Sequence, residues 1–316
     1  MSGGYDTRIY AFRLDGAPAA WAGPLILRVL RITVDPLRAL KERATQNALA
    51  GLGYPVPRVL GASADPGPLG APFLVMERVA GRPLLDAQLL GVGGVLADAH
   101  ARLHALDPEA LLRALDDEGR AVGAGFGRHA VSYDGYLEGL DARIRKAGLG
   151  GLSEAMRWLV ERRPSGAARL AICHGDFHPQ NLLVEHGRVT GVLDWPNLVV
   201  TEPEFDVAAT RVLLALTPLH LLPLPAVVRP LVALLRRIML ARYLRAYRRR
   251  LPLDAARLSY YEAAACMRGL LRTGEARVAG GAAAANPLDA SVFGDRLAAR
   301  VTQLTGVAVA LPPRGR

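Results

Sequence analysis

The spacing of apolar residues predicts a strand-rich start and a long helical remainder. Arg8–Leu14 alternates apolar and polar residues, and Leu25–Leu30 and Pro72–Val79 are apolar runs of strand length. Pro36–Leu52 instead repeats its apolar residues at helical spacing. These four segments predict a small antiparallel sheet with one helix.

Beyond the break at Ala80–Pro83, the pattern is that of helices. Val95–Leu106, Ser132–Arg145 and Leu152–Arg163 have helical periodicity, and another helix opens at Pro203. We therefore expect an α+β chain with a small N-terminal lobe at residues 1–79 and a large helical lobe at residues 80–316.

A β-hairpin interrupts the helical part. Two β-branched apolar runs flank a polar turn at residues 185–188. Pairing Val184 with Val189 across this turn brings Asn181 and Asp194 to the same open end, offset by about two residues or roughly 7 Å. A carboxylate and a carboxamide held together are oxygen ligands that suit Mg²⁺.

Asp176 stands five residues before Asn181, in a loop entered from the apolar run Leu170–Ile172. A loop carboxylate beside a metal pair is placed to accept a proton from a nucleophile. The competing interpretation is an ordinary hairpin with polar surface residues.

The segment His174–Asn181, HGDFHPQN, followed by Leu193–Trp195, LDW, resembles the aminoglycoside phosphotransferase family of small-molecule kinases. The resemblance implies a two-lobed protein-kinase-like fold that uses ATP (or GTP) and Mg²⁺ to phosphorylate a hydroxyl of a small molecule. Asp176 would orient and deprotonate that hydroxyl, and Asn181 and Asp194 would hold Mg²⁺.

The resemblance also implies a nucleotide site in the N-terminal lobe. Gly3 and Gly4 would lie in a loop whose backbone N–H groups cover the phosphates. Because the sequence opens at this loop, we expect the family's first strand to be missing here, either because the true start lies upstream or because the lobe is shortened.

Arg28 is the cation expected to pair with the phosphates, in place of the usual lysine. Glu42 on the following helix would orient it. The alternatives are an edge-strand arginine and a solvated helical glutamate. Backbone groups of Glu77 and Val79 would hydrogen-bond adenine, with Met76 at its edge.

His100 and His104 are separated by one helical turn, which is a spacing found in zinc sites. No glutamate base stands between them and the sequence offers no evident third ligand, so we expect them to pack within the protein.

Charge and cysteine content limit the setting of the protein. The 316 residues carry a formal charge of +10, almost all of it from arginine, with a dense cluster at residues 242–250. We interpret the cluster as a solvated helix face rather than a membrane-surface or anionic-partner patch, and expect no specific nucleic-acid partner. The apolar stretch 212–228 is short for a membrane span and holds three prolines. Two cysteines and no visible signal peptide favour the cytoplasm.

The acceptor is predicted from charge alone. From Val207 onward there are 17 arginines and five acidic residues, whereas a kinase of cationic aminoglycosides should surround its acceptor with carboxylates. We therefore expect a neutral or weakly charged alcohol, such as a macrolide-like antibiotic or a sugar. The rival classes are a non-catalytic kinase-like binding protein and an arginine-rich binder of nucleic acid or membrane surfaces.

Overall fold

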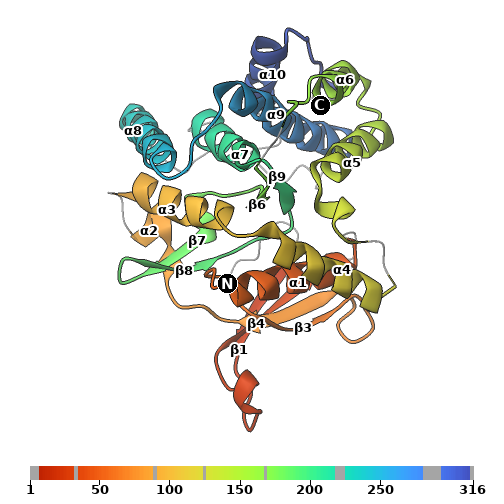
Figure 1. The fold of residues 1–316 in the computed structure, drawn as a ribbon, viewed down its shortest axis with the longest axis vertical. Coiled ribbons are helices and arrows are strands. Elements are labelled where there is room, and N and C mark those ends of the chain that lie inside the picture. The colour runs from red at the N-terminus through yellow and green to blue at the C-terminus, as the bar shows by residue number, and fades with distance from the viewer. Residues whose placement is uncertain are drawn as a thin grey trace. The chain divides into compact units, whose positions relative to one another are not determined.

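A computed structural model describes residues 7–31, 35–87, 91–123, 126–166, 169–217, 225–279 and 293–313 (Figure 1). The chain forms two compact units. The first comprises residues 1–90, 105–131 and 179–198, and the second comprises residues 91–104, 132–178 and 199–316. The lobe boundary expected after residue 79 stays a prediction.

A four-stranded antiparallel sheet in the order β1-β2-β4-β3 forms the base of the first unit. Its strands are β1 (Thr7–Phe12), β2 (Leu25–Leu30), β3 (Val59–Ser63) and β4 (Phe73–Glu77). Three of them were predicted. The fourth, β3, has the sequence VLGAS and a register shift beside Gly61, and such small residues carry little strand signal.

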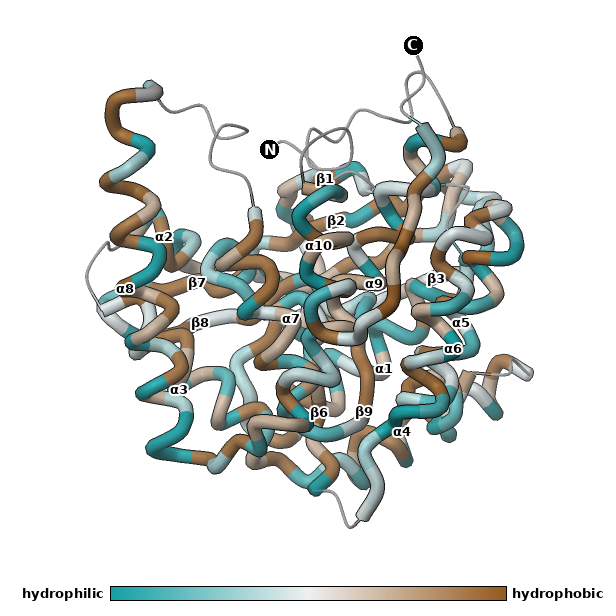
Figure 2. The backbone as a smooth tube through the Cα atoms, turned by 90° about the horizontal axis from the view of Figure 1, so that it is seen from above, coloured by the Kyte–Doolittle hydropathy of each residue, from teal (hydrophilic) through white to brown (hydrophobic). Residues whose placement is uncertain are grey.

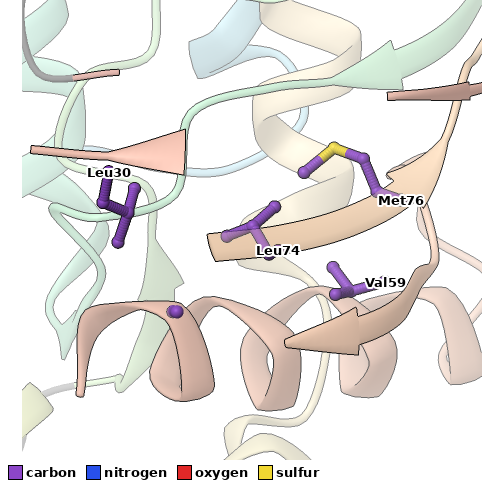
Figure 3. Close-up of a cluster of buried hydrophobic side chains, with 5 residues drawn as sticks. Leu30, Val59, Leu74 and Met76 are labelled. Carbon is purple, nitrogen blue, oxygen red and sulfur yellow. The ribbon is translucent and has the colours of Figure 1, made fainter. Parts of the chain in front are cut away.

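One face of this sheet is covered by α1 (Arg38–Gly51) (Figure 1). Leu30, Val59, Leu74 and Met76 gather between sheet and helix, where they meet Ala39 of α1 (Figure 3). Helix α4 (Pro108–Ala121) packs on α1 and is N-capped by Asp107, whose side chain accepts a hydrogen bond from the Glu109 N–H at 3.0 Å.

The predicted hairpin is present as β7 (Leu182–Glu185) and β8 (Arg188–Val192). With the short strand β5 (Arg82–Pro83) they form a sheet in the order β5-β7-β8, and α2 (Leu84–Ala87) follows β5 directly. His186 and Gly187 form the turn with φ of +49° and +75°, the left-handed geometry that two-residue hairpin turns require.

The pairing of Val184 with Val189 is confirmed, but the expected offset between Asn181 and Asp194 is wrong. Beyond this pair, a bulge adds one residue to β8, and this extra residue shifts the register of the pairs that follow. The Leu193 N–H donates to the Asn181 carbonyl at 2.8 Å. Asp194 therefore lies one residue beyond the partner of Asn181, not two.

The second unit is mainly helical. It contains α3 (Val92–His104), α5 (Tyr133–Lys146), α6 (Ser153–Glu161), α7 (Pro203–Leu216), α8 (Arg229–Arg248), α9 (Ala255–Ala279) and α10 (Phe293–Thr305), with the strand pair β6 (Ala171–Cys173) and β9 (Val199–Thr201). Helix α9 packs against α7 and α10, and α8 packs against α3. A small antiparallel sheet and a large helical part confirm the predicted α+β class.

Helix α8 alternates hydrophobic and hydrophilic residues along its length (Figure 2). Tyr243 and Tyr247 are buried, whereas Arg242, Arg245 and Arg248 are exposed, as expected for a solvated arginine face. Across the described ranges, every helix is either too short or too polar to cross a membrane.

Candidate functional site

Arg28 and Glu42 form a buried ion pair in the first unit. Arg28 comes from the middle of β2, and its Nη1 lies 2.9 Å from Glu42 Oε2. The second Glu42 oxygen accepts from Arg38 Nε at 2.9 Å, and only 1% of the Glu42 side chain is exposed. Glu42 is therefore not a solvated helix residue, and Arg28 is held by the helix that packs on its sheet.

Asp194 lies within reach of the same arginine. Its Oδ1 is 3.5 Å from Arg28 Nη2, and 43% of its side chain is exposed. Its φ of +68° places the residue in the left-handed region, a backbone state that often marks functional positions. The adjacent Trp195 is buried and donates from Nε1 to the Val192 carbonyl at 2.9 Å, which fixes the end of the hairpin.

The donors gathered at this end of the hairpin fit a nucleotide with Mg²⁺. Asp194 and Asn181 offer a carboxylate and an amide oxygen, the hard donors that Mg²⁺ prefers. Arg28 Nε is buried and has no hydrogen-bond partner among the described residues. A buried guanidinium N–H without an acceptor is costly, and a phosphate oxygen would satisfy it.

The residues expected around adenine differ in what they offer. Met76 is part of the core between the sheet and α1, with 5% exposure. The Glu77 N–H already donates to the Arg58 carbonyl at 2.9 Å, so this group is not available to adenine. Val79 lies against Gly191 of β8. Gly3 and Gly4 lie outside the described residues.

Asp176 belongs to the second unit, in a loop fixed by Asp206. The N–H groups of His174 and Gly175 donate to the Asp206 carboxylate at 2.5 and 2.8 Å. The Asp176 N–H donates to His174 Nδ1 at 3.2 Å, and Gly175 has a φ of +77°, which favours glycine. Asp206 thus holds the backbone on which the Asp176 carboxylate is carried.

Two histidines lie behind the Asp206 carboxylate. The Nε2 atoms of His100 and His104 are 3.0 and 3.3 Å from Asp206 Oδ2. Their Nδ1 atoms lie 2.7 and 2.6 Å from the hydroxyls of Tyr243 and Tyr247 on α8. The histidines therefore pack within the protein, as expected, and contact the loop anchor.

Electrostatics in this buried cluster favour neutral imidazoles around a carboxylate. Burial, reinforced by His104, lowers the pKa of His100 to about 4. Burial opposes ionisation of Asp206, but His100 and His104 outweigh it and hold the pKa of Asp206 well below its usual range. His100, His104 and Asp206 are the ligand types of a metal site. Since the carboxylate already accepts two backbone N–H groups, we interpret the cluster as a loop anchor.

Sequence reasoning missed this convergence. The three residues are up to 106 positions apart in the numbering, and only the i, i+4 spacing of the histidines was visible. Asp206 lies in the first turn of α7, where a carboxylate is favoured by the helix dipole, but this position alone does not name its partners.

A small pocket in the second unit has Asp176 in its wall. The rest of its lining comes from α7, α9 and α10: Ala209, Val212, Leu213, Ala265, Arg268, Gly269, Arg272, Phe293 and Leu297. The lining is mostly apolar, and among the described residues Asp176 is its single carboxylate. Cys173 nearby in sequence is fully buried, and burial raises the pKa of its thiol well above the usual range, which excludes it as a nucleophile at neutral pH.

Comparison with known proteins identifies relatives of this chain. A sequence model described as the phosphotransferase enzyme family matches residues 1–253. Acyl-CoA dehydrogenase family member 11 of Gallus gallus is 32% identical over 177 residues, covering 53% of this chain and 22% of that protein. Viomycin phosphotransferase of Streptomyces vinaceus is 30% identical over 169 residues, covering 51% of this chain and 58% of that protein. The chain thus spans only about a fifth of the length of the first relative.

Solved structures share the fold. A putative aminoglycoside phosphotransferase from Ralstonia eutropha superposes with a TM-score of 0.62 at 20% identity, covering 96% of this chain and 93% of that chain. A thermostable mutant of aminoglycoside phosphotransferase APH(4)-Ia, solved with ADP and hygromycin B, gives a TM-score of 0.58 at 17% identity, covering 95% of this chain and 92% of that chain. The kinase-like fold expected from the sequence is confirmed.

Proposed function

Because the chain belongs to the phosphotransferase enzyme family, we propose that it transfers the γ-phosphoryl group of ATP, with Mg²⁺, to a hydroxyl of a small molecule. The observation that carries this proposal is the buried Arg28–Glu42 ion pair, with the partly exposed Asp194 carboxylate 3.5 Å from the Arg28 guanidinium. A fixed cation beside an exposed carboxylate is the arrangement that binds phosphates together with a divalent metal.

Arg28 binds phosphate oxygens, and Glu42 keeps its guanidinium in place. Glu42 is itself held by Arg38, so the cation does not depend on a flexible partner. Asn181 and Asp194 would hold Mg²⁺, which would neutralise phosphate charge when bound. Backbone groups near Glu77 and Val79 contact adenine, and the Glu77 N–H is excluded from that set by its bond to Arg58.

Asp176 is the residue that handles the proton. Its carboxylate accepts a hydrogen bond from the acceptor hydroxyl and takes the proton as the hydroxyl oxygen bonds to the γ-phosphorus. The bond between that phosphorus and the bridging oxygen of ADP breaks at the same time. Asp206 supports this step indirectly, because it fixes the backbone at His174 and Gly175. The pocket beside Asp176 receives the part of the acceptor that carries the hydroxyl.

The first test is nucleotide binding. The thermal unfolding of the full chain is followed with ATP, with and without Mg²⁺, for the wild type and for Asp194→Asn. We expect a Mg²⁺-dependent rise in Tm for the wild type that the variant loses, because a ligand that binds only the native state stabilises it. Equal behaviour of the two proteins would refute the assignment of Asp194.

The second test is turnover. Acceptor classes come from the names of the relatives: aminoglycosides, viomycin-like peptides and, because a hydroxyl is required, hydroxyacyl-CoA thioesters. Macrolides and sugars complete the panel. Asp176→Asn should keep the Mg²⁺-dependent Tm shift and lose at least about 10²-fold in kcat, the usual contribution of a general base. A wild type that binds ATP and phosphorylates none of these classes would favour a kinase-like binding protein instead.

A further inference from the structure

A second cavity of the helical unit is lined by four arginines. Its volume is about 510 Å³, and it lies between the end of α7 and the helices α8 and α10. Arg229, Arg236 and Arg237 come from α8, and Arg296 comes from α10. The rest of the lining is apolar: Leu214, Ala215, Ala233 and Leu240.

None of these four arginines pairs with a carboxylate anywhere in the described ranges. Arg236 donates to the carbonyls of Ala215, at 3.1 Å, and Thr217, and Arg296 Nη1 donates to the Leu216 carbonyl at 3.4 Å. Arg229 Nε is buried and has no acceptor within the same ranges. Buried polar atoms are normally satisfied, so a buried N–H donor without a partner calls for an explanation.

Other arginines of the same unit are neutralised. Arg143 pairs with Glu275, and Arg300 with Glu262, at 2.6 Å in both cases. The excess of arginine in the chain therefore does not by itself explain why the four arginines of the cavity have no carboxylate partner among the described residues. Burial and the neighbouring Arg296 and Arg237 lower the pKa of Arg236. A bound anion would relieve this repulsion.

The number and type of the cations favour phosphate over a single carboxylate. A guanidinium presents a planar fork that matches two phosphate oxygens. The positive charge of four such groups around one cavity is neutralised better by an anion with at least two negative charges than by one carboxylate. The volume exceeds what one inorganic phosphate needs, which fits a phosphate ester with an attached organic part.

This cavity adjoins the Asp176 pocket along two helices. On α7, Leu213 lines the Asp176 pocket and the next residue, Leu214, lines the arginine cavity. On α10, Leu297 lines the Asp176 pocket and the preceding residue, Arg296, lines the arginine cavity. Neighbouring residues of a helix rise by only about 1.5 Å, so the two hollows lie on adjacent sides of the same turns. An acceptor seated in the Asp176 pocket would reach the arginine cavity by extending around these turns.

We infer that the four-arginine cavity binds a phosphate group already present on the acceptor, so that the substrate is a phosphorylated alcohol. This inference rests on the proposed kinase function. It departs from the neutral or weakly charged acceptor expected from the sequence, because four of the arginines of this region line one cavity.

The binding arm uses inorganic pyrophosphate as the probe and isothermal titration calorimetry in metal-free buffer. The pocket variant is Arg229→Gln with Arg237→Gln, neither of which makes an ion pair with a described residue. The control is Arg242→Gln with Arg245→Gln, which removes the same charge from exposed positions of α8. We expect the Kd to rise at least tenfold in the pocket variant and less than twofold in the control. Equal changes in both would mean bulk charge only and would overturn the inference.

The turnover arm uses pairs of acceptors that differ only in phosphate, such as a hydroxyacyl-4′-phosphopantetheine and the corresponding hydroxyacyl-pantetheine, or a sugar phosphate and its sugar. For the wild type, kcat/KM should be at least tenfold higher for the phosphorylated member, through a lower KM. The pocket variant should lose this preference and keep its KM for ATP. A wild type without preference refutes the phosphorylated acceptor while the kinase function stands. Absence of Mg²⁺-dependent ATP binding refutes the kinase function first.

Discussion

Acidification from pH 7 to pH 5 should destabilise the second unit through His100. Its imidazole is fully buried between Asp206, Tyr243 and the ring of Phe177, which stacks on it at 4.0 Å between centroids. The folded protein therefore holds this histidine neutral, with a pKa of about 4 against an ordinary value of 6.5.

The sign and size follow from proton uptake. Between these two pKa values the unfolded chain binds a proton at His100 and the folded chain does not, so stability falls as the pH falls. The contribution is complete above about pH 6.5 and is lost down to about pH 4. Integration over pH 7 to pH 5 gives a loss of about 2 kcal/mol from this one group.

The assay is urea unfolding followed by far-UV circular dichroism at pH 7, 6 and 5. His100→Gln removes the titrating group, so its free energy of unfolding should depend less on pH than that of the wild type, by about 2 kcal/mol over this range. His186→Asn removes an exposed imidazole from the β7–β8 turn and should leave the pH dependence of the wild type unchanged. Identical pH dependence of wild type and His100→Gln would refute the reasoning.

Three further outcomes are expected. Glu42→Gln should raise the KM for ATP at least fivefold in steady-state kinetics and lower the free energy of unfolding by about 3 kcal/mol, because it breaks a buried ion pair; an unchanged KM would contradict the role of Arg28. Asp206→Asn should cost about 3 kcal/mol in urea unfolding, since an amide N–H₂ would face backbone donors. Gly93→Ala should cost about 1–3 kcal/mol, because its Cβ would meet Met239 O of α8 at 2.6 Å. At Gly94 an added Cβ would meet no atom within 4 Å, so Gly94→Ala should raise the free energy of unfolding by about 0.5–1 kcal/mol in the same assay. Equal effects of Gly93→Ala and Gly94→Ala on stability would be inconsistent with the α3–α8 packing.

The basic composition acquires a different meaning once the fold is known. In the sequence, the arginines at residues 242–250 form the densest cluster, and the structure exposes them to solvent. Arg229, Arg236 and Arg296 are not conspicuous in the sequence, yet they surround one cavity. Charge density along the chain therefore gave a poor guide to charge density in space.

The sequence by itself determined the features that rest on local rules. Alternation and length predict β1, β2 and β4, and the polar turn fixes the pairing of Val184 with Val189, because a hairpin register follows from its turn. The HGDFHPQN and LDW segments identify the family, since those residue types are needed in that order along one loop and one hairpin. Arg28 and Glu42 could be proposed as partners because each is placed by a predicted element and by the resemblance.

Tertiary structure alone decided what depends on packing between distant segments. The bulge in β8 moves Asp194 by one residue, and no single-strand pattern shows it. The contacts of Asp206 with His100 and His104 exist because α3 and α7 meet behind the loop that carries Asp176. Neighbours far away in the chain determine which arginines are buried, which form ion pairs and which face a cavity. The role of each charged side chain therefore depends on its burial and partners rather than on its residue type.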